Sequence, residues 1–295
     1  MPKSKSNGKF ARARLRHAIF TRGADLLLGG RLRERHLEDK IELRSYDVAI
    51  PKWRRELDGL RIGHLSDLHL GDLMPGARVN EAIELLSKEN VDLVAFTGDA
   101  VDLHWQGVET FFEGLVSVPA PLGHYLVLGN HDHLDDADAV VRAAREAGIT
   151  VLLDESVSVA TDRGVPLRIG GIDWAKKLPE CSEKVELVAG KDEELCDLLL
   201  SHNPKGFIEA TRKEIPLTLS GHTHGGQVAI KGRPDRNLAV AHRLSAGFYE
   251  RDGSVLFVTT GVGAWFPLRV HCPPEVVVLQ VRSGDWSDPM EASSD

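Results

Sequence analysis

The chain has 295 residues, of which 42% are hydrophobic and 27% are charged, a composition typical of a soluble globular protein with a sizeable buried core. This composition excludes a disordered chain, a collagen and a small disulfide scaffold. The formal net charge of −8 argues against a general nucleic-acid binder. The charge is unevenly distributed: ten basic and two acidic residues give residues 1–36 a charge of +8, so the remainder carries −16.

The cysteines and the first residues bear on the cellular compartment. Cys181, Cys196 and Cys272 show no close pairing, which suits a reducing environment. Arginines interrupt every candidate secretory signal, and no uncharged apolar run is long enough to cross a bilayer. We therefore expect a cytoplasmic protein. Peripheral attachment to the cytoplasmic membrane face through the basic segment is a hypothesis, and a merely disordered arm is its alternative.

From about residue 41 onward, short β-rich runs alternate with helical patterns, which indicates layered α/β architecture. We expect a basic arm over 1–40, one domain over 41–282 and a polar tail over 283–295. The predicted strands cover 41–50, 61–65, 91–96, 125–128, 198–200, 217–219, 255–259 and 276–281, the predicted helices cover 77–89 and 136–147, and a hairpin joins 151–160 to 165–172.

Aspartate, asparagine and histidine collect directly after the predicted strands. Ligand sites in open α/β sheets lie outside the carboxyl ends of strands, so separate loops can converge on one place. Five loops fit this pattern: Asp67-x-His69, Gly98-Asp99, Gly129-Asn130-His131-Asp132, His202-Asn203-Pro204 and Gly221-His222-Thr223-His224. Each piece alone is an ordinary turn signal, but five in order after apolar strands favour one functional site.

The residue types in these loops predict a metal site. Carboxylate, imidazole and amide ligands without thiolates disfavour structural zinc and favour catalytic Mn²⁺, Fe or Zn²⁺. Two carboxylates, one asparagine and four histidines are too many for one ion and suit two ions that share a bridging carboxylate. Such a pair clamps both oxygens of an in-line displacement at phosphorus.

The loop sequences also resemble a known family. SDLHLGD (66–72), TGDAVD (97–102), LGNHDH (128–133), SHNP (201–204) and SGHTHGGQV (220–228) are similar to the five signature blocks of the calcineurin-like metallophosphoesterases. The stretch at 261–281, GVGAWFPLRVHCPPEVVVLQV, resembles the bacterial YaeI-type phosphodiesterase branch. The resemblance spans about residues 42–281. It implies an α/β fold of four layers, α-β-β-α, in which two mixed sheets are flanked by helices.

The resemblance also implies a role for each matched residue. The first metal would be held by Asp67, His69, Asp99 and His224, with Asp99 bridging to a second metal held by Asn130, His202 and His222. A metal-bridging hydroxide would attack the phosphodiester. His131 would donate a proton to the leaving group, and Asp132 is a hypothetical partner that orients His131.

Several functions stay open beside phosphodiester hydrolysis. A relative with the same pattern cleaves UDP-2,3-diacylglucosamine in lipid A synthesis, so that reaction is the main alternative. A non-catalytic metal-binding scaffold and a protein phosphatase are more distant ones. We expect a small phosphodiester or nucleotide-lipid substrate and no specific nucleic-acid partner.

Three aromatic residues outside the ligand set have two interpretations. Trp174, Trp265 and Phe266 either contact a substrate or membrane, or pack against a neighbouring loop. On the first interpretation, Trp265→Ala with Phe266→Ala raises the KM for a lipid-like diester and leaves a small diester unaffected.

Overall fold

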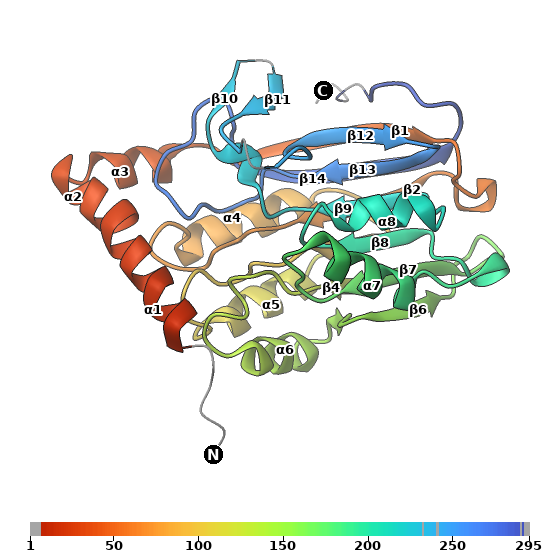
Figure 1. The fold of residues 1–295 in the computed structure, drawn as a ribbon, viewed down its shortest axis with the longest axis horizontal. Coiled ribbons are helices and arrows are strands. Elements are labelled where there is room, and N and C mark those ends of the chain that lie inside the picture. Colours follow the sequence, from red (N-terminus) through yellow and green to blue (C-terminus); the bar gives the residue numbers. More distant parts are fainter. Residues whose placement is uncertain (1–6, 232, 240–241, 290, 292–295) are drawn as a thin grey trace.

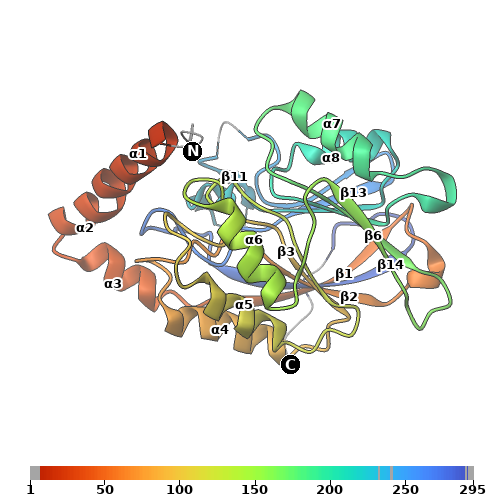
Figure 2. The same ribbon diagram turned by 90° about the horizontal axis from the view of Figure 1, so that it is seen from below.

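The computed structural model describes residues 7–231, 233–239, 242–289 and 291. Two six-stranded sheets pack face to face, and helices cover the outer face of each sheet (Figures 1 and 2). The predicted four-layer α/β architecture is confirmed.

The first sheet combines strands from both ends of the domain. Its order is β1 (Glu42–Ile50), β14 (Glu275–Ser283), β2 (Leu60–Leu65), β3 (Leu93–Phe96), β4 (His124–Leu126) and β5 (Thr150–Val151). The run from β2 to β5 is parallel, whereas β14 is antiparallel to β2 and parallel to β1. The carboxyl ends of β2, β3 and β4 therefore meet at one edge.

The second sheet repeats this arrangement. Its order is β12 (Gly247–Arg251), β13 (Ser254–Val258), β9 (Leu217–Ser220), β8 (Leu198–Ser201), β7 (Leu167–Ile172) and β6 (Glu155–Val159). The central strands are parallel and the two edge strands antiparallel. The predicted hairpin corresponds to the antiparallel pair β6 and β7.

Alternating side chains explain why the strands read as continuous apolar runs. In β3, Leu93 and Ala95 face the second sheet, whereas Val94 and Phe96 face the helices. All four are completely buried. A strand covered on both faces needs apolar residues at every position, so both sheets lie inside the core.

In the described part of the chain, five helices cover the sheets. The first sheet is covered by α4 (Gly76–Ser87), α5 (Val108–Val116) and α6 (Ala137–Glu146), and the second by α7 (Leu178–Val188) and α8 (Gly206–Arg212). The structure confirms the two predicted helices as α4 and α6, and α6 begins where Asp136 caps the amide of Ala139.

The remaining short elements lie in loops. They are the 3₁₀ turns η2 (Arg55–Leu57), η3 (Asp192–Glu194) and η4 (His224–Gly226), and the two-stranded sheet of β10 (Ala229–Ile230) and β11 (Arg233–Asn237).

The described part of the basic arm is helical. It comprises α1 (Asn7–Arg16), the π-helical η1 (His17–Gly23), α2 (Ala24–Leu27) and α3 (Arg31–Glu38). Gly29 and Gly30 adopt positive φ and turn the chain between α2 and α3. Figures 1 and 2 show the arm along one side of the body. Among the described residues, no helix is long and apolar enough to cross a membrane.

The arm is attached to the body by polar contacts. The ring of His36 lies 3.2 Å from the carbonyl oxygen of Leu73, and Arg78 donates to the carbonyls of Leu37 and Asp39 at 2.8 Å. His36 is 1% exposed. Burial, followed by Arg269 and Arg78, lowers the pKa of His36 to about 4. The neutral ring therefore fits this contact at pH 7.

Candidate metal centre

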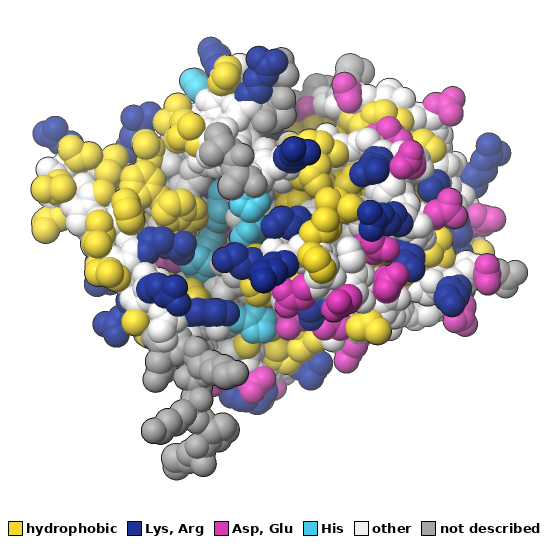
Figure 3. Space-filling model, viewed as in Figure 1, with side chains coloured by type: hydrophobic (Ala, Val, Ile, Leu, Met, Phe, Trp, Pro, Cys, Tyr) yellow, Lys and Arg dark blue, Asp and Glu magenta, His cyan; other side chains and the backbone are white. Residues whose placement is uncertain are grey.

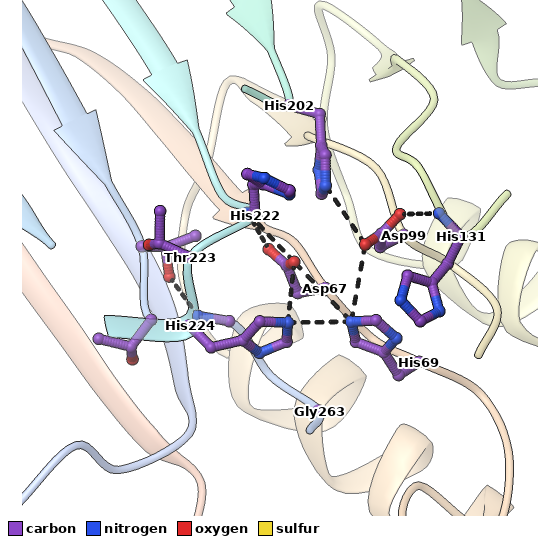
Figure 4. Close-up of polar contacts among 12 residues, drawn as sticks. Asp67, His69, Asp99, His131, His202, His222, Thr223, His224 and Gly263 are labelled. Atoms are coloured by element: carbon purple, nitrogen blue, oxygen red, sulfur yellow. Dashed lines mark hydrogen bonds and ion pairs between the residues drawn. The ribbon is translucent and has the colours of Figure 1, made fainter. Parts of the chain in front are cut away.

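Five loops that follow β2, β3, β4, β8 and β9 meet at the carboxyl ends of the two sheets (Figure 4). They bring together acidic and histidine side chains that are up to 157 positions apart, from Asp67 to His224. Each strand is anchored in the core, so the loops that follow have fixed starting points.

The first group consists of Asp67, His69 and His224. Their potential ligand atoms all lie within 4.8 Å of one another. The Nε2 atoms of His69 and His224 are 3.0 Å apart, and His224 Nε2 lies 3.2 Å from an Asp67 oxygen. All three side chains are buried. Two ring nitrogens and a carboxylate oxygen thus point at one small volume, as ligands of one cation do.

The second group of potential ligands shares Asp67 with the first. Asp67, Asp99 and His202 form a further cluster of close ligand atoms. Asp99 Oδ2 lies 3.3 Å from His202 Nε2 and 3.7 Å from His69 Nε2. Asp99 therefore faces histidines of both groups, the position that a bridging carboxylate requires.

The remaining predicted ligands are His222 and Asn130, and His222 lies beside the second group. The His222 ring is 5.1 Å from the His202 ring, centroid to centroid. The Asn130 side-chain oxygen is buried without a hydrogen-bond partner among the described residues. Buried polar atoms without partners are costly, and a cation removes this cost. The donor set therefore fits bound metal ions.

The backbone of the site is strained at the same residues. Asp67, His69, Asp99, His222 and His224 have φ between 49° and 73°. Left-handed backbone is unfavourable for residues with a side chain, and it persists where the surrounding structure imposes it, often at functional sites. Five of the seven predicted ligands are thus held in conformations that their own propensities disfavour.

Glycines allow two pairs of these loops to approach each other. A Cβ atom on Gly129 would collide with the Asp99 carboxylate, and one on Gly221 would collide with the Asp67 carboxylate. The turn glycines noted in the sequence therefore make room for the ligands of other loops.

The charges of the site shift its pKa values. Burial opposes ionisation of Asp67 and Asp99, but neighbouring histidines outweigh it and lower both pKa values. Burial also opposes protonation of His202, yet Asp99 and Asp67 raise its pKa to about 9. A cation that binds there would replace this proton.

The pKa values of two further predicted ligands, His222 and His224, are lowered. Burial lowers the pKa of His224 to about 4, and burial together with His202 lowers that of His222 to about 3. Both rings are therefore neutral at pH 7, the form that coordinates a metal.

Comparison with known proteins decides the family. The model of the calcineurin-like phosphoesterases matches residues 60–226, more than half of the chain. The chain belongs to the calcineurin-like phosphoesterase family. It is a metal-dependent phosphoric ester hydrolase.

Three relatives of this metallophosphoesterase cover most of it. An uncharacterized metallophosphoesterase of Aquifex aeolicus is 30% identical over 81% of this chain and 94% of its own length. The phosphodiesterase YaeI of Escherichia coli is 30% identical over 75% of this chain and 82% of its own. An uncharacterized Campylobacter jejuni metallophosphoesterase is 28% identical over 82% of this chain, which spans 63% of that longer relative.

His131 lies at the edge of the metallophosphoesterase centre. Its amide donates to Asp99 at 2.6 Å, and its Nδ1 lies 2.6 Å from the carbonyl oxygen of Asp102. A carbonyl only accepts hydrogen bonds, so Nδ1 carries a proton and Nε2 is free to exchange one. Burial lowers the pKa of His131, but Asp99 and Asp102 outweigh it and raise the pKa overall.

Asp132 has a different partner from the one hypothesised. Its carboxylate accepts the amides of Asp99, Ala100 and Gly129 at 2.8 to 2.9 Å and that of Val101 at 3.3 Å. Asp132 therefore ties two ligand loops together. The carboxylate that faces His131 belongs to Asp102, 3.4 Å from Nδ1. Sequence reasoning missed Asp102, although it closes the TGDAVD block.

The aromatic residues fall on two sides of the site. The Trp174 ring packs 4.9 Å from His222 and 5.6 Å from His202. Trp265 lies against the arm, where its carbonyl accepts from Thr21 at 2.8 Å. The sequence singled out Trp265 but not its contact with the arm, because the arm residues show no motif.

Proposed function

We propose that this metallophosphoesterase hydrolyses phosphodiesters with two divalent metal ions, Mn²⁺, Fe or Zn²⁺. Asp67, His69, Asp99 and His224 would hold one ion, and Asn130, His202 and His222 would hold the other with Asp99 shared. The single observation that carries this proposal is the position of Asp99 between the two groups of histidines. When bound, such ions supply a hydroxide nucleophile at neutral pH and neutralise charge on the phosphoryl group.

The side chains around the ions supply the proton transfer. Asp102 accepts at His131 Nδ1 and fixes the ring orientation. Asp99 and Asp102 raise the pKa of His131, which favours the protonated ring. Its Nε2 would deliver that proton to the leaving oxygen as the ester bond breaks.

A cavity that is lined in part by Asp102, the partner of His131, favours amphiphilic diesters as a second candidate class, which includes UDP-2,3-diacylglucosamine. It measures about 480 Å³ and lies between the arm and the α4–α5 side of the body. Apolar residues including Leu70, Met74 and Phe111 line it, and Asp102 belongs both to this wall and to the His131 contact. This volume is within the range that holds small ligands.

The substrate class is tested by activity after metal reconstitution. We expect the protein loaded with Mn²⁺, Fe²⁺ or Zn²⁺ to hydrolyse a small chromogenic diester faster than the matching monoester. UDP-2,3-diacylglucosamine is assayed in parallel. Preference for that lipid establishes the alternative, and metal-independent hydrolysis or none contradicts the proposal.

We further propose that the arm attaches the protein to the cytoplasmic face of an anionic membrane. Ten large hydrophobic side chains are exposed in the described part of the chain, and six lie in the arm: Leu15, Ile19, Phe20, Leu26, Leu27 and Leu28. Exposed arginines surround them, whereas the body is acidic. Apolar side chains combined with basic ones bind an anionic lipid surface. Figure 3 shows the apolar arm beside the hollow that histidines line.

A further inference from the structure

Arg16, the last residue of α1, reaches from the arm into the metal centre. Its Nη2 lies 3.1 Å from His131 Nε2, although 115 positions separate the two residues. The His131 ring in turn packs 4.5 Å from the ring of His69, a predicted ligand. The His131 side chain thus connects the guanidinium of Arg16 to His69, a predicted metal ligand.

No carboxylate of the described residues neutralises the guanidinium of Arg16. Among the described residues Arg16 forms no ion pair, whereas its neighbour Arg22 pairs with Asp72 at 2.8 Å. His17 likewise pairs with Asp102 at 3.0 Å. A guanidinium stays charged at every physiological pH. Arg16 is therefore available to an anion that enters the site.

Trp265 holds the guanidinium in place. The Arg16 Cζ lies 5.2 Å from the centre of the Trp265 ring, in a cation–π contact. The Trp265 carbonyl accepts from Thr21, one helical turn further along the arm. Thr21 is 3% exposed, so this anchor is buried although the Arg16 side chain is exposed.

The contact with His131 also shows what a substrate would change. Arginine only donates hydrogen bonds, so Nε2 of His131 accepts from Arg16 and cannot donate to a leaving group at the same time. Phosphoryl oxygens are stronger acceptors for a guanidinium than a neutral imidazole, because the hydrogen bonds are charge-assisted and can be bidentate. A bound phosphoester would draw Arg16 from Nε2, and that nitrogen could then take up the proton that it donates to the leaving oxygen.

We propose that Arg16 binds the phosphoryl group of the substrate, so that the N-terminal arm supplies part of the active site. This inference rests on the phosphodiesterase function proposed above. It also gives Trp265 a positioning role that does not depend on a lipid chain. The expectation for Trp265 changes accordingly: its loss should raise the KM for a small diester as well.

The test compares Arg16→Gln and Arg16→Lys with Arg12→Gln in the full-length, metal-loaded protein. Arg12 is a matched control, because it is exposed on the same helix and bonds to the Gly8 carbonyl of that helix. With a small soluble diester, we expect Arg16→Gln to raise KM about ten- to a hundredfold, the value of a hydrogen bond to a charged group. Arg16→Lys should recover part of this loss, and Arg12→Gln should match the wild type.

Binding of inorganic phosphate to the same proteins gives a readout without turnover. Calorimetry should show a matching loss of phosphate affinity in Arg16→Gln, with metal content unchanged. An unaltered phosphate affinity and KM in Arg16→Gln overturns the inference. If the wild type hydrolyses no phosphoester, the proposed function fails, and phosphate binding still decides the role of Arg16.

Discussion

At the scale of residues, the sequence predicts the candidate ligand set because those side chains follow apolar strands at short, recognisable spacings. The structure brings Asp67, His69, Asp99, His202 and His224 into close clusters. Residues that act through backbone contacts leave no such pattern. The function of Asp132 depends on which amides of a distant loop face it, and that follows only from the folded chain.

Substitution of Asp132 tests its structural role. In Asp132→Asn one carboxylate oxygen becomes an NH₂ group, which would face backbone amides instead of accepting from them. We expect the free energy of unfolding to fall by about 2–3 kcal/mol, the cost of losing hydrogen bonds to a buried charged group. Chemical denaturation measures this loss. The control is Asp162→Asn in the exposed β6–β7 turn, and equal stability of the two variants would refute the role.

At the scale of elements, strands with apolar runs were predictable and several helices were not. Leu198–Ser201 and Leu217–Ser220 are short, wholly buried strands that end at glycine or polar residues. The nine-residue helix α5, in contrast, was missed, although its buried residues Val108, Phe111, Phe112 and Leu115 have the helical spacing i, i+3, i+4, i+7. The helical arm was also hard to predict, because arginines intrude on its apolar stripe.

The arm offers a direct test of membrane attachment. Leu26 and Leu27 are 81% and 87% exposed, so replacing both with glutamate should not affect folding. We expect Leu26→Glu with Leu27→Glu to reduce co-sedimentation with anionic vesicles at least about tenfold, through lost apolar burial and added negative charge. Leu187→Glu serves as the control, because Leu187 is 74% exposed on α7. Unchanged pelleting of the double variant would rule out this surface.

At the scale of the whole molecule, the candidate site draws its residues from both sheets. Asp67, Asp99 and Asn130 follow strands of the first sheet, whereas His202, His222 and His224 follow strands of the second. The core between the sheets therefore sets the separation of the two halves of the ligand set. Sequence order predicted this convergence, but not that the arm would lie beside it.

The central claim is that Asp99 joins two metal ions, and metal stoichiometry measured together with turnover tests it most directly. After reconstitution we expect two ions in the wild type and loss of both metal and metal-stimulated hydrolysis in Asp99→Ala. His131→Ala should keep both ions while its turnover falls about 10²- to 10⁴-fold, as loss of a proton donor does. An Asp99→Ala protein that retains two ions and wild-type turnover would contradict the account.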